Sequence, residues 1–291
     1  MENQQRLFIK INRDNLPRVS DRYPFIYLER GRLEIDDSSV KWIDSDGNVV
    51  RLPMATLNTI LLGPGTSVTH EAIKVMTASN CTVCWVGEDS LLFYAVGQSP
   101  THDTRNVKLQ AKLASNPKTR LTVSRKLFAF RFPEVDVIDK SQQQLMGMEG
   151  KRVKDLYQAL AEKYHVGWKG RSYKPGRFEL SDTTNRMLTS MNTALYGILT
   201  SVIYHLGYSP HIGFIHSGSP LPFVYDIADL YKDELCIENA FRLTKELAGN
   251  YNRAFVANEF RKEVVRLKLL YRVPSDIENL LRTGDGSSNS E

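Results

Sequence analysis

A glutamate interrupts the apolar face of one predicted helix. At 100° per residue, Glu149 falls in the same arc as Leu145, Val153, Leu156 and Leu160. Because burying a lone carboxylate is expensive, it must be neutralised, paired or bound to a metal ion. The residues leave two alternatives open for Glu149: an ion pair with a Lys or Arg from another helix, or a position as a metal ligand.

A histidine and two aspartates follow in a second region. His216 lies in a glycine-flanked segment without charged residues. Asp226 and Asp229 are three residues apart in a helix predicted over 223–235, so they share a face, and Asp233 follows one turn later. Taken alone, the imidazole could be a satisfied core group and the carboxylates a solvated acidic face.

Taken together, these side chains form a donor set for a divalent cation. Two or three carboxylates with one imidazole suit Mg²⁺ or Mn²⁺, and the lack of cysteine in the set argues against structural zinc. The sequence contains no Walker, protein-kinase, nucleophile-elbow or Rossmann motif. A metal beside basic helices would act on a phosphodiester by polarising the phosphoryl oxygen and stabilising the leaving oxygen.

The basic residues are concentrated in one segment. The chain carries 38 Lys and Arg against 33 Asp and Glu, a formal charge of +5. Eight of the 38 lie within residues 105–132, where no acidic residue occurs, which leaves 30 basic against 33 acidic residues elsewhere. They are Arg105, Lys108, Lys112, Lys118, Arg120, Arg125, Lys126 and Arg131. Such a run favours a polyanion such as nucleic acid; the alternative is a solvated face balanced by acids elsewhere in the fold.

The opposite pattern occurs over residues 187–225, where 39 consecutive residues include no Asp, Glu, Lys or Arg. Several Ser, Thr and Asn side chains make a membrane span costly there. We therefore predict a helix over 182–206 that is buried at the centre of a helical domain.

The elements that must position these residues change character along the chain. With 291 residues, 42% of them hydrophobic and 24% charged, the composition is globular, and the length suggests about two domains. Period-two segments predict strands at 25–28, 32–35, 40–43, 49–52, 59–62, 81–86 and 91–96, with a short helix at 70–78. Helical spacing follows over 105–132 and predicts further helices at 145–164, 182–206, 223–235 and 254–270. We predict an α+β multidomain fold: a small β-rich domain (1–97), a linker (98–104), a larger all-α catalytic domain (105–282) and a flexible tail (283–291).

The three cysteines do not indicate a site. Cys81 and Cys84 form a Cys-x-x-Cys pair, but in a buried strand residues three apart point to opposite faces. We therefore interpret them as structural. An odd, small number of cysteines fits a reducing compartment, and the first residues lack the pattern of a signal peptide, so a cytoplasmic location is expected.

Three blocks in this sequence resemble a known family. Leu145-Met-Gly-Met-Glu-Gly-Lys-Arg-Val153, Gly213-Phe-Ile-His-Ser-Gly218 and Phe223-Val-Tyr-Asp-Ile-Ala-Asp229 resemble, in order and spacing, the signature blocks of CRISPR-associated protein one, the spacer-acquisition integrase of prokaryotes. The likeness runs from about Arg18 to Asp276. The last block and the short Gly-Pro-Gly loop at 63–65 resemble subtype I-E.

The resemblance implies an active site. It implies a metal held by Glu149, His216 and Asp229, which would also be the catalytic residues, with Asp226 as an additional acid close by. It implies direct transesterification, in which a 3′-hydroxyl of captured DNA attacks a phosphodiester at the leader–repeat junction of a CRISPR array.

The same resemblance implies partners. They are double-stranded DNA with single-stranded 3′ ends, CRISPR repeat DNA, a second copy of the chain in a homodimer, and a dimer of CRISPR-associated protein two in a four-plus-two assembly. No membrane is implied.

Five basic residues are the expected phosphate contacts: Lys108, Lys112, Arg125, Lys126 and Arg253. Arg30 stands where relatives carry an aromatic that stacks on the duplex end. Arginine can stack through its guanidinium plane, but Tyr23 or Tyr27 could take that role instead.

Two other functions remain open. A metal-dependent nuclease for branched DNA would use the same site with water as the nucleophile. A non-catalytic nucleic-acid-binding scaffold would leave Glu149 merely salt-bridged.

Overall fold

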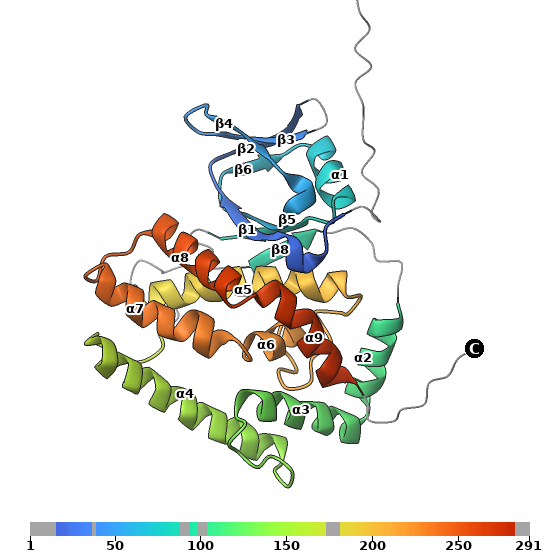
Figure 1. Ribbon diagram of the computed structural model, residues 1–291, viewed down its shortest axis with the longest axis vertical. Coiled ribbons are helices and arrows are strands. Elements are labelled where there is room, and N and C mark those ends of the chain that lie inside the picture. The colour runs from blue at the N-terminus through green and yellow to red at the C-terminus, as the bar shows by residue number, and fades with distance from the viewer. Residues whose placement is uncertain (1–15, 37–38, 88–92, 98–103, 173–180, 283–291) are drawn as a thin grey trace, which may run out of the picture.

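The structure is a computed structural model that describes residues 16–36, 39–87, 93–97, 104–172 and 181–282 (Figure 1). The first part of the chain forms eight described strands and one α-helix. Their bounds are β1 Tyr23–Leu28, β2 Gly31–Asp36, β3 Ser39–Asp44, β4 Val49–Leu52, β5 Leu57–Leu62, β6 Thr66–Val68, α1 His70–Ala78, β7 Thr82–Val86 and β8 Phe93–Gly97, with short 3-10 helices at Val19–Asp21 and Met54–Thr56.

These strands form two four-stranded sheets, ordered β1-β5-β7-β8 and β4-β3-β2-β6. The pairs β1–β5 and β5–β7 are parallel, whereas β3–β4 and β7–β8 are the two antiparallel hairpins that the sequence predicts. The β3–β4 turn is closed by Asp44, whose carboxylate accepts the N–H groups of Asp46 and Asn48, while Gly47 takes a φ of +84°. Local turn chemistry therefore fixes this hairpin.

The sheet of β1, β5, β7 and β8 has a hydrophobic core on each face. Ile60 and Leu62 of β5 pack with α1 and the second sheet, whereas Leu61 between them packs with the helical part. Cys81 and Cys84 divide in the same way between the two cores, and burial raises the pKa of the Cys81 thiol to about 12. The interpretation of these cysteines as structural is confirmed.

The rest of the described chain is helical. Its elements are α2 Arg105–Ser115, α3 Pro117–Arg131, α4 Gln142–Tyr164, α5 Thr183–His205, α6 Pro222–Ala228, a π-helix Asp233–Ile237, α7 Glu238–Glu246, α8 Arg253–Arg266 and α9 Leu269–Leu281. The predicted fold class, a β-rich part followed by a larger helical part, is confirmed (Figure 1). Residues 98–103 of the predicted linker and the predicted tail at 283–291 lie outside the described residues, and the domain boundaries stay predictions.

Helix α5 is the central element. Asp182 caps its first turn by accepting the N–H of Asn185, and most of its side chains are buried, as the uncharged stretch predicts. It packs against β5 as well as α6, α7, α8 and α9. Ser201 of α5 bonds to Asn58 and Thr82, so polar contacts also join the helix to the sheet.

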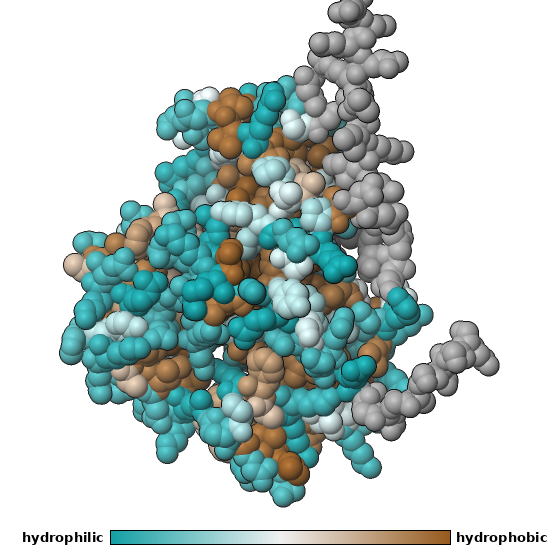
Figure 2. All heavy atoms as spheres, in the orientation of Figure 1, coloured by the Kyte–Doolittle hydropathy of each residue, from teal (hydrophilic) through white to brown (hydrophobic). Residues whose placement is uncertain are grey.

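The surface of the helical part is mostly hydrophilic. On the face shown in Figure 2, hydrophilic residues cover most of the helical part, as expected when its apolar side chains are gathered around α5. Among the described residues, no helix is long and apolar enough to span a membrane.

Two predicted helix boundaries are wrong. The helix predicted over 254–270 ends at Arg266, because Lys268 adopts φ +50° and redirects the chain into α9. This turn lets α9 pack its apolar side chains against α5 and α3, while α8 packs against β1. No helix is predicted after residue 270, although the buried residues of α9 follow helical spacing: Leu269, Leu270, Val273, Ile277, Leu280 and Leu281.

The helix predicted over 223–235 is also interrupted. Its first part ends at Ala228, and a turn and the π-helix then lead into α7. As a result, Asp229 and Asp233 do not stack on one regular helix face: Asp229 faces His216, and Asp233 faces Arg131.

Candidate metal centre

His216 is held by the loop after α5 and by α6. The carboxylate of Asp226, on α6, is fully buried and accepts the backbone N–H groups of Phe214, Ile215 and His216 at 2.6 to 3.3 Å. It also contacts the Nδ1 of His216 at 2.8 Å. The loop can lie this close because residue 213 is glycine: a Cβ there would meet Pro222 Cβ at 2.6 Å.

The imidazole is therefore oriented before any ligand arrives. The hydrogen bond with Asp226 raises the pKa of His216, against burial, which lowers it; the nearby charge of Asp229 also raises it. With Nδ1–H donated to Asp226, Nε2 faces Asp229, whose Oδ2 lies 3.4 Å away. A histidine whose outer nitrogen is held by a carboxylate is the usual arrangement behind a metal ligand.

Asp229 has a second partner at its other oxygen. Oδ1 accepts a 2.7 Å hydrogen bond from the Nζ of Lys232, one turn further along the chain. That ammonium also lies 5.0 Å from the ring centroid of Tyr196 on α5. Although burial acts to lower it, the pKa of Lys232 is raised by its pairing with Asp229 and by Tyr196.

Glu149 takes the ion-pair alternative in this structure. It lies on α4 and pairs with Arg131, the last residue of α3. The guanidinium is 7% exposed, and its second terminal nitrogen donates to Asp233 Oδ1 at 3.1 Å. Among the described residues, no three His, Cys, Asp or Glu side chains converge closely enough to hold a metal ion. The structure thus brings His216, Asp226 and Asp229 together, and it leaves Glu149 with Arg131.

The residues nevertheless fit a divalent cation. Asp226 fixes the His216 ring so that one nitrogen remains for a ligand bond, and Asp229 presents an oxygen beside it. Mg²⁺ and Mn²⁺ accept carboxylate oxygens together with one imidazole. Because Asp226 is buried and bonds through both oxygens, it supports His216 rather than offering a ligand atom.

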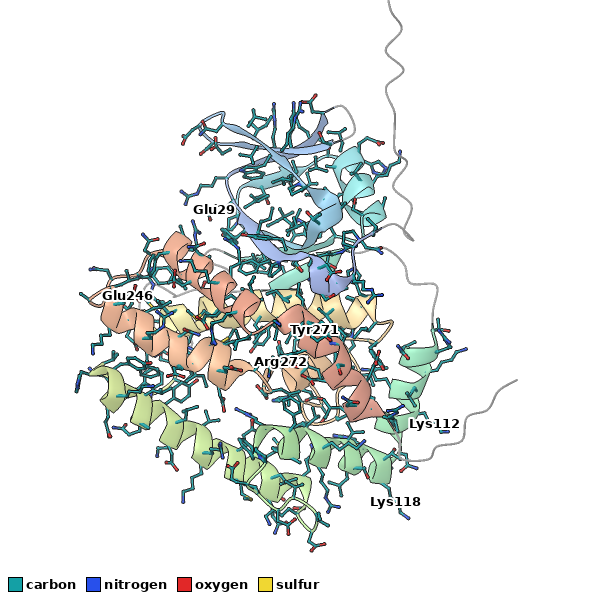
Figure 3. The ribbon with its side chains drawn as sticks, viewed as in Figure 1. Glu29, Lys112, Lys118, Glu246, Tyr271 and Arg272 are labelled. Atoms are coloured by element: carbon teal, nitrogen blue, oxygen red, sulfur yellow. The ribbon has the colours of Figure 1, made fainter. Side chains whose placement is uncertain are left out.

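The expected phosphate contacts divide into two groups. Lys108 and Lys112 are exposed on α2, and Figure 3 shows Lys112 and Lys118 pointing outward at the corner between α2 and α3. These lysines are accessible to a large polyanion, and their role in DNA binding stays a prediction.

The second group is engaged within the protein. Arg125 donates two hydrogen bonds to the carbonyl oxygen of Lys140, and the ammonium of Lys126 donates to the last carbonyls of α9, at Leu280 and Arg282. These contacts tie α3 to the loop before α4 and to the end of α9.

Arg253 is engaged in the same way. At the start of α8, it pairs with Glu29 at the end of β1, and its guanidinium lies 4.9 Å from the ring centroid of Tyr27. The hydroxyl of Tyr27 donates to Glu29 as well. Three of the five expected phosphate contacts thus already have protein partners that the sequence did not reveal.

A cavity of about 520 Å³ is lined by residues of β8 and α5. Tyr196 and Tyr225 line it, and the Tyr225 ring stands edge-on to His216, with 6.1 Å between centroids. Arg171 also lines the cavity and donates to Asn185 and Thr189. Sequence reasoning missed these aromatic residues, because nothing in their spacing distinguishes them from ordinary core residues.

Comparisons with known proteins agree on one family. Residues 131–263, which include Glu149, His216 and Asp229, match the family model described as CRISPR associated protein Cas1. A CRISPR-associated endonuclease Cas1 of Chlorobaculum tepidum is 61% identical over 279 residues, which cover 96% of this chain and 94% of that protein.

Solved structures share the fold. The crystal structure of a TtCas1–DNA complex is 33% identical with a TM-score of 0.80, and the match covers 91% of this chain and 94% of that one. A casposase bound to its integration product, 16% identical, has a TM-score of 0.66 over 92% of this chain and 94% of its own, and that likeness concerns the fold alone.

Proposed function

This chain belongs to the CRISPR-associated Cas1 family, and from that premise we propose that it is a metal-dependent DNA integrase and endonuclease that inserts short DNA fragments into a CRISPR array. One observation carries the proposal. Within the segment that matches the family model, a buried carboxylate orients His216 toward Asp229 and leaves one imidazole nitrogen for a ligand bond.

The ligands that we propose are His216, Asp229 and Glu149, for Mg²⁺ or Mn²⁺. When bound, such a cation polarises the scissile phosphodiester and stabilises the oxygen that leaves it. Asp226 keeps the imidazole in the tautomer that has Nδ1 protonated. The neighbouring ammonium of Lys232 donates a hydrogen bond to the Asp229 carboxylate and holds it in place. Glu149 must turn from Arg131 to complete the set.

We propose DNA as the substrate, with a 3′-hydroxyl of the captured fragment attacking the repeat. The TtCas1–DNA complex supports a DNA partner, and the exposed lysines of α2 are accessible to phosphates. The captured DNA would be a duplex with single-stranded 3′ ends, and the target the leader–repeat junction.

The assembly that we propose is a homodimer, two copies of which flank a dimer of CRISPR-associated protein two, in the prokaryotic cytoplasm. Its support is the family membership and the signature blocks. The Val-Tyr-Asp-Ile-Ala-Asp block at 224–229 and the Gly-Pro-Gly loop at 63–65 further favour subtype I-E.

The decisive experiment is strand transfer into supercoiled plasmid DNA that carries a leader and one repeat, with and without the small partner protein. We expect insertion at the leader–repeat junction that depends on the partner and on Mg²⁺ or Mn²⁺. Cleavage of branched DNA without any insertion, whether or not the partner is present, would instead identify a repair nuclease. DNA binding with no metal-dependent product would identify a scaffold.

A further inference from the structure

The arginine that holds Glu149 is placed between two carboxylates. One terminal nitrogen of Arg131 pairs with Glu149 of α4, and the other donates to Asp233, at the start of the π-helix. The side chain is 7% exposed, and its Nε is buried and finds no hydrogen-bond partner within the described part of the chain. Arg131 therefore depends on these two carboxylates for its pairing.

Asp229, the other carboxylate ligand that we propose, is paired with Lys232 in the same way. Among the described residues, the ion pairs of Glu149 and those of His216 together involve four carboxylates, Glu149, Asp226, Asp229 and Asp233, and two cationic side chains, Arg131 and Lys232. With a neutral imidazole, the group carries two negative charges, which is the deficit that one divalent cation would neutralise. The metal-free site is thus partly neutralised by its own side chains.

We propose that Arg131 is a positioning residue that holds Glu149 in the metal-free protein, and that Asp233 retains Arg131 when Glu149 turns to the metal ion. This inference rests on the proposed function. The guanidinium suits the role because its fixed fork of donors bonds two carboxylates at once, which a lysine ammonium does less well.

The role of Asp233 follows from burial. A buried guanidinium that loses its last carboxylate is left as an uncompensated charge, which is strongly destabilising. With Asp233 present, Arg131 keeps one partner after Glu149 leaves. Without Asp233, Arg131 would have no carboxylate partner once Glu149 turned to the metal ion. Metal binding would then be weaker.

The test measures Mn²⁺ binding to the full-length protein by isothermal titration calorimetry. We expect Asp233→Asn to weaken Mn²⁺ binding about tenfold, the scale on which groups behind a metal ligand act. The matched control is Glu234→Gln, which removes a carboxylate one residue away that pairs with Arg272 at 3.5 Å and does not contact Arg131. Equal weakening by both variants, or no weakening by Asp233→Asn, would overturn the inference.

A double-mutant cycle separates this exchange from simple charge removal. In an Arg131→Gln background no guanidinium remains to be stranded, so Asp233→Asn should change the Mn²⁺ dissociation constant by less than about twofold. The same tenfold loss in both backgrounds would mean that Asp233 acts only through its charge, and the inference would be wrong.

Two further measurements keep the result interpretable. If Arg131→Gln does not fold by circular dichroism, the comparison of Asp233→Asn with Glu234→Gln still decides the matter. Mn²⁺ binding that His216→Ala leaves unchanged would refute the proposed metal site itself, whereas a loss in His216→Ala with no loss in Asp233→Asn would refute only the role of Asp233.

Discussion

The imidazole of His216 is held by a carboxylate that is itself fixed by backbone N–H groups, whereas Glu149 is held by a single arginine, although we expect both to bind the same metal ion. In the histidine half of the site (His216, Asp226 and Asp229), a buried carboxylate gathers three backbone N–H groups and the imidazole. In the glutamate half (Glu149, Arg131 and Asp233), every contact is between side chains.

The two halves of the site differ in which contacts can exchange partners. Backbone contacts fix the histidine half, because moving Asp226 would leave several buried donors unsatisfied. Side-chain ion pairs can exchange partners without moving a helix, so the glutamate half is the one that can adjust when a ligand arrives.

The largest effect is expected on activity. Ala substitution at Glu149, His216 or Asp229 should abolish strand transfer, because each removes a proposed metal ligand, while duplex binding measured by fluorescence anisotropy remains. Glu162→Ala, at an exposed position of the same α4 helix, is the control and should transfer normally. Full integration by His216→Ala with Mn²⁺ present would contradict the ligand set.

The next largest effect is on stability in the histidine half. Asp226→Asn keeps the shape of the side chain but turns an amide NH₂ toward donors that need an acceptor. We expect the free energy of unfolding to fall by about 3 kcal/mol, since buried donors are left unsatisfied. Urea denaturation followed by circular dichroism measures this; a fall below about 1 kcal/mol would show that the histidine half is not rigidly built.

The glutamate half should respond less to the same kind of change. Glu149→Gln leaves Arg131 with Asp233, so no buried charge is stranded, and we expect a loss of about 1 kcal/mol in the same urea experiment. If Glu149→Gln destabilises the protein as much as Asp226→Asn does, the two halves are equally fixed and the contrast fails.

Much of the fold could be predicted because its signals are local. The β3–β4 hairpin follows from an Asp-Gly turn, and α5 follows from its cap, Asp182, and from the uncharged residues that begin at Met187 in its second turn. The left-handed turn at Lys268 and the π-helix after α6 could not be predicted, because neither contains a glycine or proline to mark it. Both features depend on how the apolar side chains of α8, α9 and the π-helix pack against α5.

The site could be predicted only in part for a similar reason. The signature blocks identify Glu149, His216 and Asp229 as a set, but they do not say which side chains neutralise them. Arg131 is one of eight basic residues in the segment 105–132, four of which, Lys108, Lys112, Arg125 and Lys126, are expected phosphate contacts. Its burial and its two carboxylate partners depend on how α3 meets α4 and the π-helix, which no spacing within α3 encodes.

A smaller effect separates exposed from engaged basic residues. Lys112→Gln should reduce by about 1 the slope of log binding constant against log salt concentration, because an exposed lysine that contacts a phosphate releases one counterion. Arg253→Gln should leave this slope unchanged, because Arg253 is paired with Glu29 and Tyr27. Equal reductions would mean that Arg253 exchanges Glu29 for a phosphate when DNA binds.

The smallest effect is a pH dependence at the Glu29–Arg253 pair, which, like the glutamate half, is built from side chains alone. Burial acts to raise the pKa of Glu29, but hydrogen bonds from Arg253 and Tyr27 lower it by more, to below its ordinary value of 4.5. A carboxyl with a lowered pKa in the folded state stabilises the protein at neutral pH and loses that contribution as the pH falls below about 4.5. Arg253→Gln should therefore flatten the decline in unfolding free energy between neutral and acidic pH, whereas Arg266→Gln, which removes an exposed arginine paired with Glu263 within α8, should leave it unchanged. An unchanged pH profile in Arg253→Gln would mean that the Glu29–Arg253 pair contributes nothing to the free energy of unfolding. An ion pair between side chains would then connect β1 and α8 without stabilising the protein.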